Sequence, residues 1–331
     1  TDSRVEIMKI HSFLPIYVLF GLLAMGCKSP NLQVQEVPVR WDTLSDVGSG
    51  MLVRLDSFQS AYISTRPIDV WLPSNYQPKR KHAVLYMYDG QMLFDASSTW
   101  NHQEWRVDET MDSLIAAKII LPTIVVGLHN GGVQRNFEYF PQVPFEQLKK
   151  SFSDSLMKNI ALHYGSDSSF PVQSDAYLKY MVKEVKPLID ATFSTYTSKE
   201  ATVVAGSSMG GLMSMYALGE YPEVFGTALC MSTHWPGGYA PNEQVPEAFQ
   251  TYIATHIHAS NRSKIYFDYG TETLDQMYEP FQLEVNEVLL KNGFVHEHTW
   301  LTRKFVEHEH NEQSWAKRLH IPIKFALEKQ R

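Results

Sequence analysis

Apolar residues follow two different patterns along this chain, and each pattern predicts a kind of strand. Residues 83–88 and 119–127 are almost wholly apolar, as expected of strands that are buried on both faces of a sheet. Residues 51–58 and 68–72 alternate between apolar and polar, which indicates antiparallel strands with one face toward solvent. Further central strands are predicted around three apolar centres: Val203, Leu229 and Ile265.

Helix-forming stretches separate the apolar runs. We expect helices at five places: 104–117, 175–191, 211–218, 279–291 and 311–327. Strands that alternate with helices indicate an α/β fold class, with a doubly wound, mostly parallel sheet and helices on both faces. Two connections, 130–174 and 232–263, are long and rich in aromatic residues. Because long connections are usually functional or disordered, we expect some of these aromatic side chains to line a substrate pocket and the others to pack onto the core.

The segment Gly206-Ser207-Ser208-Met209-Gly210 carries the strongest chemical signal. It fits the G-x-S-x-G nucleophile elbow, in which a strand ends, the chain turns sharply and a helix begins. The glycines permit a turn tight enough to lift the Ser208 hydroxyl above the strand end. A random chain of this length contains such a pentapeptide about once in ten cases, but here an apolar strand precedes it and a predicted helix follows. We therefore interpret Ser208 as a nucleophile.

A serine nucleophile needs a base, and the base needs an acid that orients it. In a strand–elbow–helix arrangement the acid and then the histidine follow the serine along the chain. One downstream strand leads into three carboxylates: Asp268, Glu272 and Asp275. A later strand-like stretch, 298–302, leads into two histidines: His308 and His310. Both clusters follow strand ends, where the catalytic residues of open α/β sheets collect.

Taken in order, these segments resemble the putative-esterase family of α/β-hydrolases. That family includes esterase D, feruloyl esterase domains, enterobactin esterases and the mycolyltransferase antigens. The resemblance runs from about Gly50 to the C-terminus and rests on five segments: 70–73 (VWLP), 85–95 (LYMYDGQMLFD), 206–211 (GSSMGG), 269–275 (YGTETLD) and 310–312 (HNE). It implies an α/β-hydrolase fold and a serine carboxylic-ester hydrolase that works through an acyl-enzyme without a cofactor.

Position by position, the resemblance implies Ser208 as the nucleophile and His310 as the general base. It implies the backbone amide of Met209 as one donor of an oxyanion hole. The second donor should come from the loop after 83–88, where we choose the amide of Gln91.

The acid has two candidates in the loop after the strand near Ile265. The G-T-x-T-L-D form of this segment ends on Asp275, which we favour, and Glu272 is the alternative acid. Asp268 lies within the strand and is expected to be structural. The H-N-E sequence before a predicted helix favours His310 over His308, which we expect to be a partly exposed loop histidine.

Four further residues are expected to border the substrate pocket: Trp100, Trp105, His234 and Trp235. Arg135 and Glu138 could form an ion pair near it. The substrate is expected to be a small-molecule or polysaccharide ester, with acetyl or feruloyl groups on plant polysaccharide as the leading possibility. Three alternatives stay open: an acyltransferase, a siderophore esterase, and a non-catalytic lipoprotein that binds a glycan or siderophore.

The N-terminal residues predict export. Met8 looks like a natural start, with residues 1–7 upstream of it, and the apolar run 13–23 is too short to span a bilayer but suits a signal peptide. The sequence Ala-Met-Gly before Cys27 resembles a bacterial lipobox, so we expect a signal peptide over 1–27 and a lipid on Cys27 that anchors the protein to a membrane. Residues 28–46 would be a tether and 47–331 the esterase domain of a cell-envelope lipoprotein. An ordinary signal peptide or a buried helix is the alternative.

Composition excludes several other classes. Hydrophobic residues make up 44% and charged residues 20%, which is ordinary for a packed domain. The net charge is −7 with no long basic run, so nucleic-acid binding is not expected. The three H-x-H pairs are scattered, without a metal-binding motif, and no nucleotide-binding glycine motif is present. Besides Cys27, the one cysteine is Cys230, in an apolar run, which predicts a small buried hydrophobe.

Overall fold

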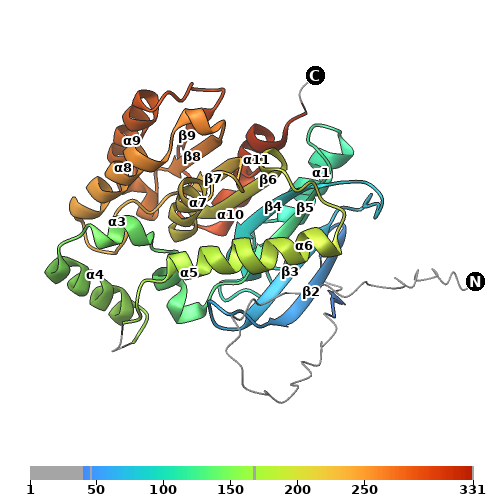
Figure 1. Ribbon diagram of the computed structural model, residues 1–331, viewed down its shortest axis with the longest axis horizontal. Helices are drawn as coiled ribbons and strands as arrows, with labels where there is room; N and C mark the ends of the chain where they lie inside the picture. The colour runs from blue at the N-terminus through green and yellow to red at the C-terminus, as the bar shows by residue number, and fades with distance from the viewer. Residues whose placement is uncertain (1–39, 45–46, 167–168, 330–331) are drawn as a thin grey trace, which may run out of the picture. The chain divides into compact units, whose positions relative to one another are not determined.

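The computed structural model describes residues 40–44, 47–166 and 169–329. Within these ranges nine strands form one sheet in the order β1-β2-β3-β5-β4-β6-β7-β8-β9 (Figure 1). The strands are β1 (Asp42–Leu44), β2 (Met51–Phe58), β3 (Arg66–Leu72), β4 (Ala83–Tyr88), β5 (Thr123–Leu128), β6 (Thr202–Ser207), β7 (Thr227–Met231), β8 (Lys264–Gly270) and β9 (Trp300–Phe305). Strands β5, β4, β6, β7, β8 and β9 are parallel, whereas β1, β2 and β3 are antiparallel. The expected mostly parallel sheet is confirmed.

Residues of β4 divide between two apolar cores, one on each face of the sheet. Val84, Tyr86 and Tyr88 belong to one core, and the alternate residues Leu85 and Met87 belong to the other. This division explains why the strand is apolar throughout, since both of its faces are buried.

Helices cover both faces. Three pack on the face of Leu85 and Met87: α1 (Val107–Ala116), α10 (Glu312–Arg318) and α11 (His320–Leu327). The other face carries α2 (Arg135–Tyr139), α3 (Gln142–Glu146), α4 (Lys150–His163), α5 (Ser174–Lys179), a π-helical turn (Tyr180–Val185), α6 (Lys186–Thr192), α7 (Met209–Glu220), α8 (Gln244–His256) and α9 (Glu279–Lys291). In Figure 1, α6 and α7 lie in front of the sheet. Among the described residues, no helix has the length and apolar character needed to cross a membrane.

Most predicted elements are present with shifted ends. The helix expected over 279–291 matches α9, whereas the one expected over 311–327 divides into α10 and α11 at Leu319. The strand expected over 119–127 begins later, at Thr123, because Lys118 turns the chain with a φ of 60° and Pro122 follows.

The two long connections are folded, and their aromatic side chains mostly fill the core. The first contains α2, α3 and α4, and the second contains α8. Phe137, Tyr139, Phe140 and Phe249 are buried, whereas Tyr239 is 39% exposed. The expectation that some of these rings pack onto the core is confirmed for these four, which stabilise the layer of helices.

The expected signal peptide and Cys27 lie outside the described residues, as does most of the expected tether. Its last part is not a tether, because Asp42–Leu44 forms strand β1 and pairs with β2. Cys230 is buried in β7, as predicted.

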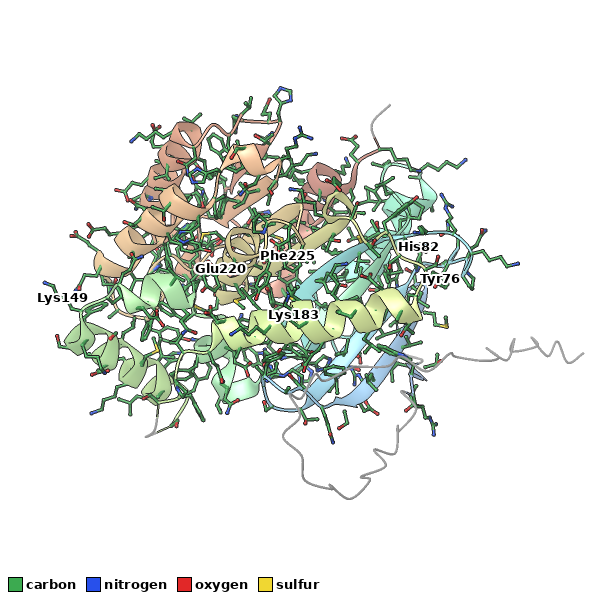
Figure 2. All side chains as sticks on the ribbon, in the orientation of Figure 1. Tyr76, His82, Lys149, Lys183, Glu220 and Phe225 are labelled. Atoms are coloured by element: carbon green, nitrogen blue, oxygen red, sulfur yellow. The ribbon has the colours of Figure 1, made fainter. Side chains whose placement is uncertain are left out.

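The amino ends and the carboxyl ends of the parallel strands carry different residues. Figure 2 shows Tyr76 and His82 side by side at the amino end of β4, where their rings stack with centroids 4.8 Å apart. At the opposite, carboxyl end, Asp89 follows β4, Ser208 follows β6 and Ser232 follows β7. The candidate catalytic residues therefore lie at the carboxyl ends of the strands, where open α/β sheets bind their ligands.

Candidate active site

The chain turns sharply at Ser208, between β6 and α7. Ser208 has a φ of 57° and a ψ of −122°, a combination that is strained for any residue with a side chain. A Cβ atom on Gly206 would lie 2.8 Å from the backbone of Gly210, so the turn closes because both positions lack side chains. The Ser208 amide donates to the carbonyl of Met231 at 3.0 Å, and the His234 amide donates to the Ser208 carbonyl at 3.2 Å. This is the strained geometry of a nucleophile elbow.

A buried carboxylate pairs with His310. His310 Nδ1 lies 2.5 Å from Asp275 Oδ1, and Asp275 is fully buried. The second oxygen of Asp275 accepts hydrogen bonds from Ser232 Oγ at 2.5 Å and from the Gly270 amide at 2.6 Å. Burial acts to raise the pKa of Asp275, but these hydrogen bonds and that of His310 outweigh it and hold the pKa below its ordinary value. Asp275 is therefore ionised, so His310 carries its proton on Nδ1 and leaves Nε2 free to accept another.

Three further contacts fix the imidazole ring. The backbone amide of His310 donates to Thr273 Oγ1 at 2.8 Å. The ring meets the indole of Trp315 nearly edge to face, with centroids 5.1 Å apart, and the ring of Tyr278 at 5.8 Å. A ring held in this way cannot rotate away from its acid.

Met231, the last residue of β7, and Ser232, which follows it, join the elbow to the acid. Met231 accepts the hydrogen bond of the Ser208 amide, and Ser232 Oγ donates to Asp275. Ser232 Oγ also accepts from Trp315 Nε1 at 2.9 Å and from Arg318 at 2.8 Å. Among the described residues, Ser208 forms its hydrogen bonds through its backbone, and no bond between Ser208 Oγ and His310 is formed. Such bonds are often long before a substrate binds.

Two helix starts meet beside the elbow. Met209 is the first residue of α7, and Gln91 lies in the short 3₁₀ helix η1 (Gly90–Met92). Amides at the start of a helix have no acceptor within that helix. A Cβ atom on Gly210 would lie 3.4 Å from that of Tyr88, so the end of β4 packs directly on the elbow. Both helix starts therefore lie near the elbow, and the role of the Met209 and Gln91 amides as oxyanion donors stays a prediction.

Arg135 lies against the turn that leads into η1. Asp89 makes that turn with a φ of 58°, and its carboxylate accepts two hydrogen bonds from Arg135, both at 2.7 Å. Asn130 Nδ2 adds a third at 2.7 Å. The expected pair between Arg135 and Glu138 is wrong, because Glu138 instead accepts from Arg66 at 2.6 Å within the core. Arg135 and Glu138 thus each pair with a residue outside α2.

The other candidates for acid and base lie elsewhere. Glu272 is exposed and accepts from Thr271 Oγ1 at 3.1 Å. Asp268 pairs with Arg318 at 2.8 Å inside the core, and His308 Nδ1 lies 3.3 Å from the Ser314 carbonyl. The structure thus brings Asp275, and none of these, to His310.

The residues expected to border the pocket differ in exposure. Trp105 is buried by stacking on Trp315, with centroids 5.0 Å apart, and Trp235 is buried against Phe267. Neither ring is open to a substrate in this structure, because each fills a core on one face of the sheet. By contrast, the side chain of Trp100 is 84% exposed.

His234 is also buried, beneath the elbow. Its Nε2 donates to the Gly238 carbonyl at 3.1 Å, and its Nδ1 accepts from Tyr278 Oη at 2.6 Å. Burial, together with the nearby His310, lowers the pKa of His234 to about 3. His234 is therefore neutral, and both of its ring nitrogens form hydrogen bonds within the protein. Because it is buried, it has a structural role and is not open to a substrate.

Sequence reasoning did not single out the supporting residues Ser232, Tyr278 and Arg318. Ser232 could have been found, since it follows a predicted central strand, as Ser208 does. Nothing in the sequence pattern marks Tyr278 or Arg318. Within the described ranges, no group of three or more His, Cys, Asp or Glu side chains is arranged to hold a metal ion.

Comparison with known proteins relates this site to esterases. Over 165 residues the chain is 24% identical to the uncharacterized protein YjcH of Bacillus subtilis (strain 168). These residues make up 50% of this chain and 54% of that protein. The chain thus matches about half the length of this curated relative.

Solved structures of esterases share the fold. A ferulic acid esterase superposes with a TM-score of 0.58 at 17% identity, covering 83% of this chain and 97% of that one. A mutant feruloyl esterase module from Clostridium thermocellum, complexed with sinapinate, superposes with a TM-score of 0.58 at 15% identity. The match covers 88% of this chain and 96% of that one. The ferric enterobactin esterase (fes) from Salmonella typhimurium superposes with a TM-score of 0.56 at 15% identity. The match covers 83% of this chain and 57% of that one. The fold is that of the α/β-hydrolases.

The family model with the description "Putative esterase" matches residues 60–321, a range that includes every residue of the site described above. This match and the shared fold support ester hydrolysis. The chain belongs to the putative-esterase family of α/β-hydrolases.

Proposed function

We propose that this protein is a serine carboxylic-ester hydrolase that works through an acyl-enzyme. The observation that carries the proposal is the 2.5 Å contact between His310 Nδ1 and the buried carboxylate of Asp275. Ser208 occupies a strained turn at the end of β6, which β7 separates from β8, the strand that leads to Asp275. A nucleophile, a base and an orienting acid from three separate strand ends support acyl transfer.

Each group then has a defined role. His310 Nε2 takes the proton of Ser208 as the serine oxygen attacks the ester carbonyl, and the carbonyl oxygen becomes an oxyanion. The amides of Met209 and Gln91 stabilise that charge, and losing one such donor typically costs about 10²–10³ in rate. His310 next gives its proton to the leaving alkoxide, and the acyl group stays on Ser208. Water, activated by the same histidine, then releases the acid.

The surroundings of Asp275 support its role. An ionised carboxylate beside His310 stabilises the imidazolium that forms during both transfers. Its negative charge is compensated by two neutral donors and by Arg318, which lies 3.8 Å from the carboxylate. This compensation keeps Asp275 ionised while leaving the proton on His310.

The substrate we propose is an acyl group, acetyl or feruloyl, carried by a polysaccharide. Relatives named as ferulic acid and feruloyl esterases share the fold at 17% and 15% identity, and these names support that substrate class. The enterobactin esterase relative makes a siderophore ester the second candidate. Transfer of the acyl group to another alcohol would use the same residues.

Ser208→Ala tests the mechanism. The variant should lose at least about 10³-fold in kcat/KM on a simple acetate ester, because the covalent step is removed. A fluorophosphonate probe should label the wild-type protein at residue 208, as peptide mass spectrometry would show. The matched control is Ser207→Ala, which removes the adjacent hydroxyl and should keep labelling. Retention of turnover by Ser208→Ala would refute the mechanism.

A further inference from the structure

The loop between η1 and α1 carries an unusually exposed tryptophan. Trp100 is 84% exposed, more than any other large hydrophobic side chain among the described residues. A single exposed apolar residue needs no explanation by itself. The structure of the loop, its position and the cavity beside it make this one informative.

The loop is held rigidly in place. Its base is closed by two backbone hydrogen bonds, from the Trp105 amide to Met92 at 3.1 Å and from the Val107 amide to Leu93 at 3.2 Å. Within it, the amide of Gln103 donates to Thr99 Oγ1 at 3.0 Å, and Thr99 is itself buried. A loop tied in this way presents Trp100 in one place, so little entropy is lost when a ligand stacks on the ring.

Two contacts attach the loop to the segment of His310. Asn101 Nδ2 donates to Glu312 Oε2 at 2.8 Å, and Trp105 stacks on Trp315. Trp315 in turn packs against the His310 ring. Because His310 gives its proton to the leaving alcohol, the alcohol part of the ester lies on this side of the site. Trp100 therefore lies on a loop that is attached to the side of the site where we expect the alcohol.

A cavity of about 620 Å³, with both polar and apolar groups in its wall, adjoins the loop of Trp100. Ala96 and His102, on either side of Trp100 in the loop, both line it, and it extends along α10 and α11. Its lining includes side chains that can form hydrogen bonds: Gln103, Glu104, Arg106, Gln313, Lys317 and His320. Its size is that of a site for a small ligand or a few linked units.

This combination of groups fits one class of ligand. Apart from Trp100, the loop from 95 to 103 has a single apolar residue, Ala96. A protein partner or a membrane would require a contiguous apolar patch, which the loop does not provide. A sugar ring has one flat face of C–H groups for the indole and several hydroxyls for planar polar side chains, so it matches both parts.

We propose that Trp100 and the adjoining cavity form a carbohydrate subsite that binds the alcohol part of the ester, a pyranose ring followed by further sugar units. The proposal rests on the esterase function above and specifies where on this protein the polysaccharide binds. Trp100 stacks on the first ring, and the cavity along α10 takes the next units.

Hydrolysis of two esters with the same acyl group tests the subsite. Partially acetylated xylo- and manno-oligosaccharides reach the cavity, whereas ethyl acetate carries an alcohol too small to reach Trp100. Trp100→Ala should raise KM for one of the oligosaccharide esters roughly five- to tenfold, since stacking contributes on the order of one tenfold step in binding. The kcat/KM on ethyl acetate should stay within twofold. The Trp100→Phe variant keeps a smaller ring, so its KM for the oligosaccharide ester should lie between those of wild type and Trp100→Ala.

A matched control lies at the amino ends of the parallel strands, opposite to the site. Tyr196 is also an exposed aromatic residue, 44% exposed, and its amide bonds to His82 at the amino end of β4. Tyr196→Ala should leave both esters unaffected. An inactive Ser208→Ala protein should show a shift in tryptophan fluorescence on titration with the preferred oligosaccharide without its acetyl groups. The added Trp100→Phe substitution should abolish that shift.

The outcomes separate the two proposals. If the oligosaccharide esters react no better than ethyl acetate, or if Trp100→Ala changes both substrates alike, the subsite is wrong while the esterase proposal stands. If the wild-type protein hydrolyses neither ester and the fluorophosphonate does not label Ser208, the esterase proposal itself fails.

Discussion

The structure contains two buried aspartate–histidine pairs, and they are alike in most respects. Asp275 lies 2.5 Å from His310, and Asp69 of β3 lies 2.8 Å from His129, which directly follows β5. The histidine side chains are 10% and 12% exposed, and both aspartates are almost wholly buried. Residue type, distance and burial therefore do not distinguish a catalytic pair from a structural one.

Two features do separate the pairs. His310 bonds to its acid through Nδ1, which leaves Nε2 at the far end of the ring, whereas His129 uses Nε2. Asp69 also accepts two hydrogen bonds from Arg54, at 2.6 and 2.8 Å, so its charge is already neutralised by a cation. Asp275, by contrast, has Arg318 only at 3.8 Å, beyond hydrogen-bond distance. The comparison teaches that the direction of the ring and the charge around the acid decide what such a pair can do.

Removing each histidine should give the largest difference between the pairs. His310→Ala should lower kcat/KM on a simple acetate ester by about 10³–10⁴-fold, because no base remains for Ser208. His129→Ala should stay within about threefold of wild type, since His129 contacts no group of the proposed mechanism. Both variants are measured at neutral pH under conditions where circular dichroism shows them folded. A comparable loss of rate in both would break the distinction drawn here.

The same substitution at the two acids should affect different properties. Asp275→Asn should lower kcat/KM by about 10²–10⁴-fold, since an amide no longer holds the required tautomer of His310. Asp69→Asn should leave the rate near wild type but lower the free energy of unfolding by about 2 kcal/mol, because Arg54 loses its partner. The estimate for Asp69 lies below the usual cost of breaking a buried pair because the Arg54 side chain is 28% exposed.

Urea unfolding and steady-state rates measure the two effects separately. Glu272→Gln, which changes an exposed carboxylate in the same loop as Asp275, serves as the control and should change neither quantity. A rate for Glu272→Gln as low as that of Asp275→Asn would move the acid to Glu272.

The sequence predicted the residues of the candidate site better than the pair formed by Asp69 and His129. Ser208, Asp275 and His310 follow strand ends in a fixed chain order, so local pattern and order were enough to bring them together as candidates. Asp69 and His129 offer no such signal, because their pairing depends on the register between β3 and β5, where Ile68 faces Leu128. A sequence pattern does not report the register between strands that are distant in the chain.

Burial was the other property that the sequence could not provide. Trp100 and Trp105 are five positions apart and look alike as candidates, yet one is 84% exposed and the other only 3%. The difference arises because Trp105 meets Trp315, which is more than two hundred residues further along the chain. The partners of Arg135 and Glu138 were misjudged for the same reason, since their true partners, Asp89 and Arg66, lie far away in sequence.

A third buried histidine sharpens the comparison, because His234 has no carboxylate partner. Its nitrogens bond to a carbonyl and to a tyrosine hydroxyl, and burial together with the nearby His310 lowers its pKa to about 3. In the unfolded chain the pKa is about 6.5. Between these values the unfolded state binds a proton that the folded state does not, so the free energy of unfolding falls as the pH falls below about 6.5. The loss stops growing below a pH of about 3.

His234→Gln, which keeps a donor and an acceptor but does not titrate, should remove this contribution. From pH 7.5 to pH 5 the wild-type protein should lose about 2 kcal/mol more of its free energy of unfolding than the variant, at about 1.4 kcal/mol for each pH unit below 6.5. Urea unfolding of both proteins at the two pH values measures the difference, and the other titrating groups cancel. Equal pH dependence in wild type and His234→Gln would mean that His234 is protonated in the folded protein, and that burial without an acid does not keep a histidine neutral beside this site.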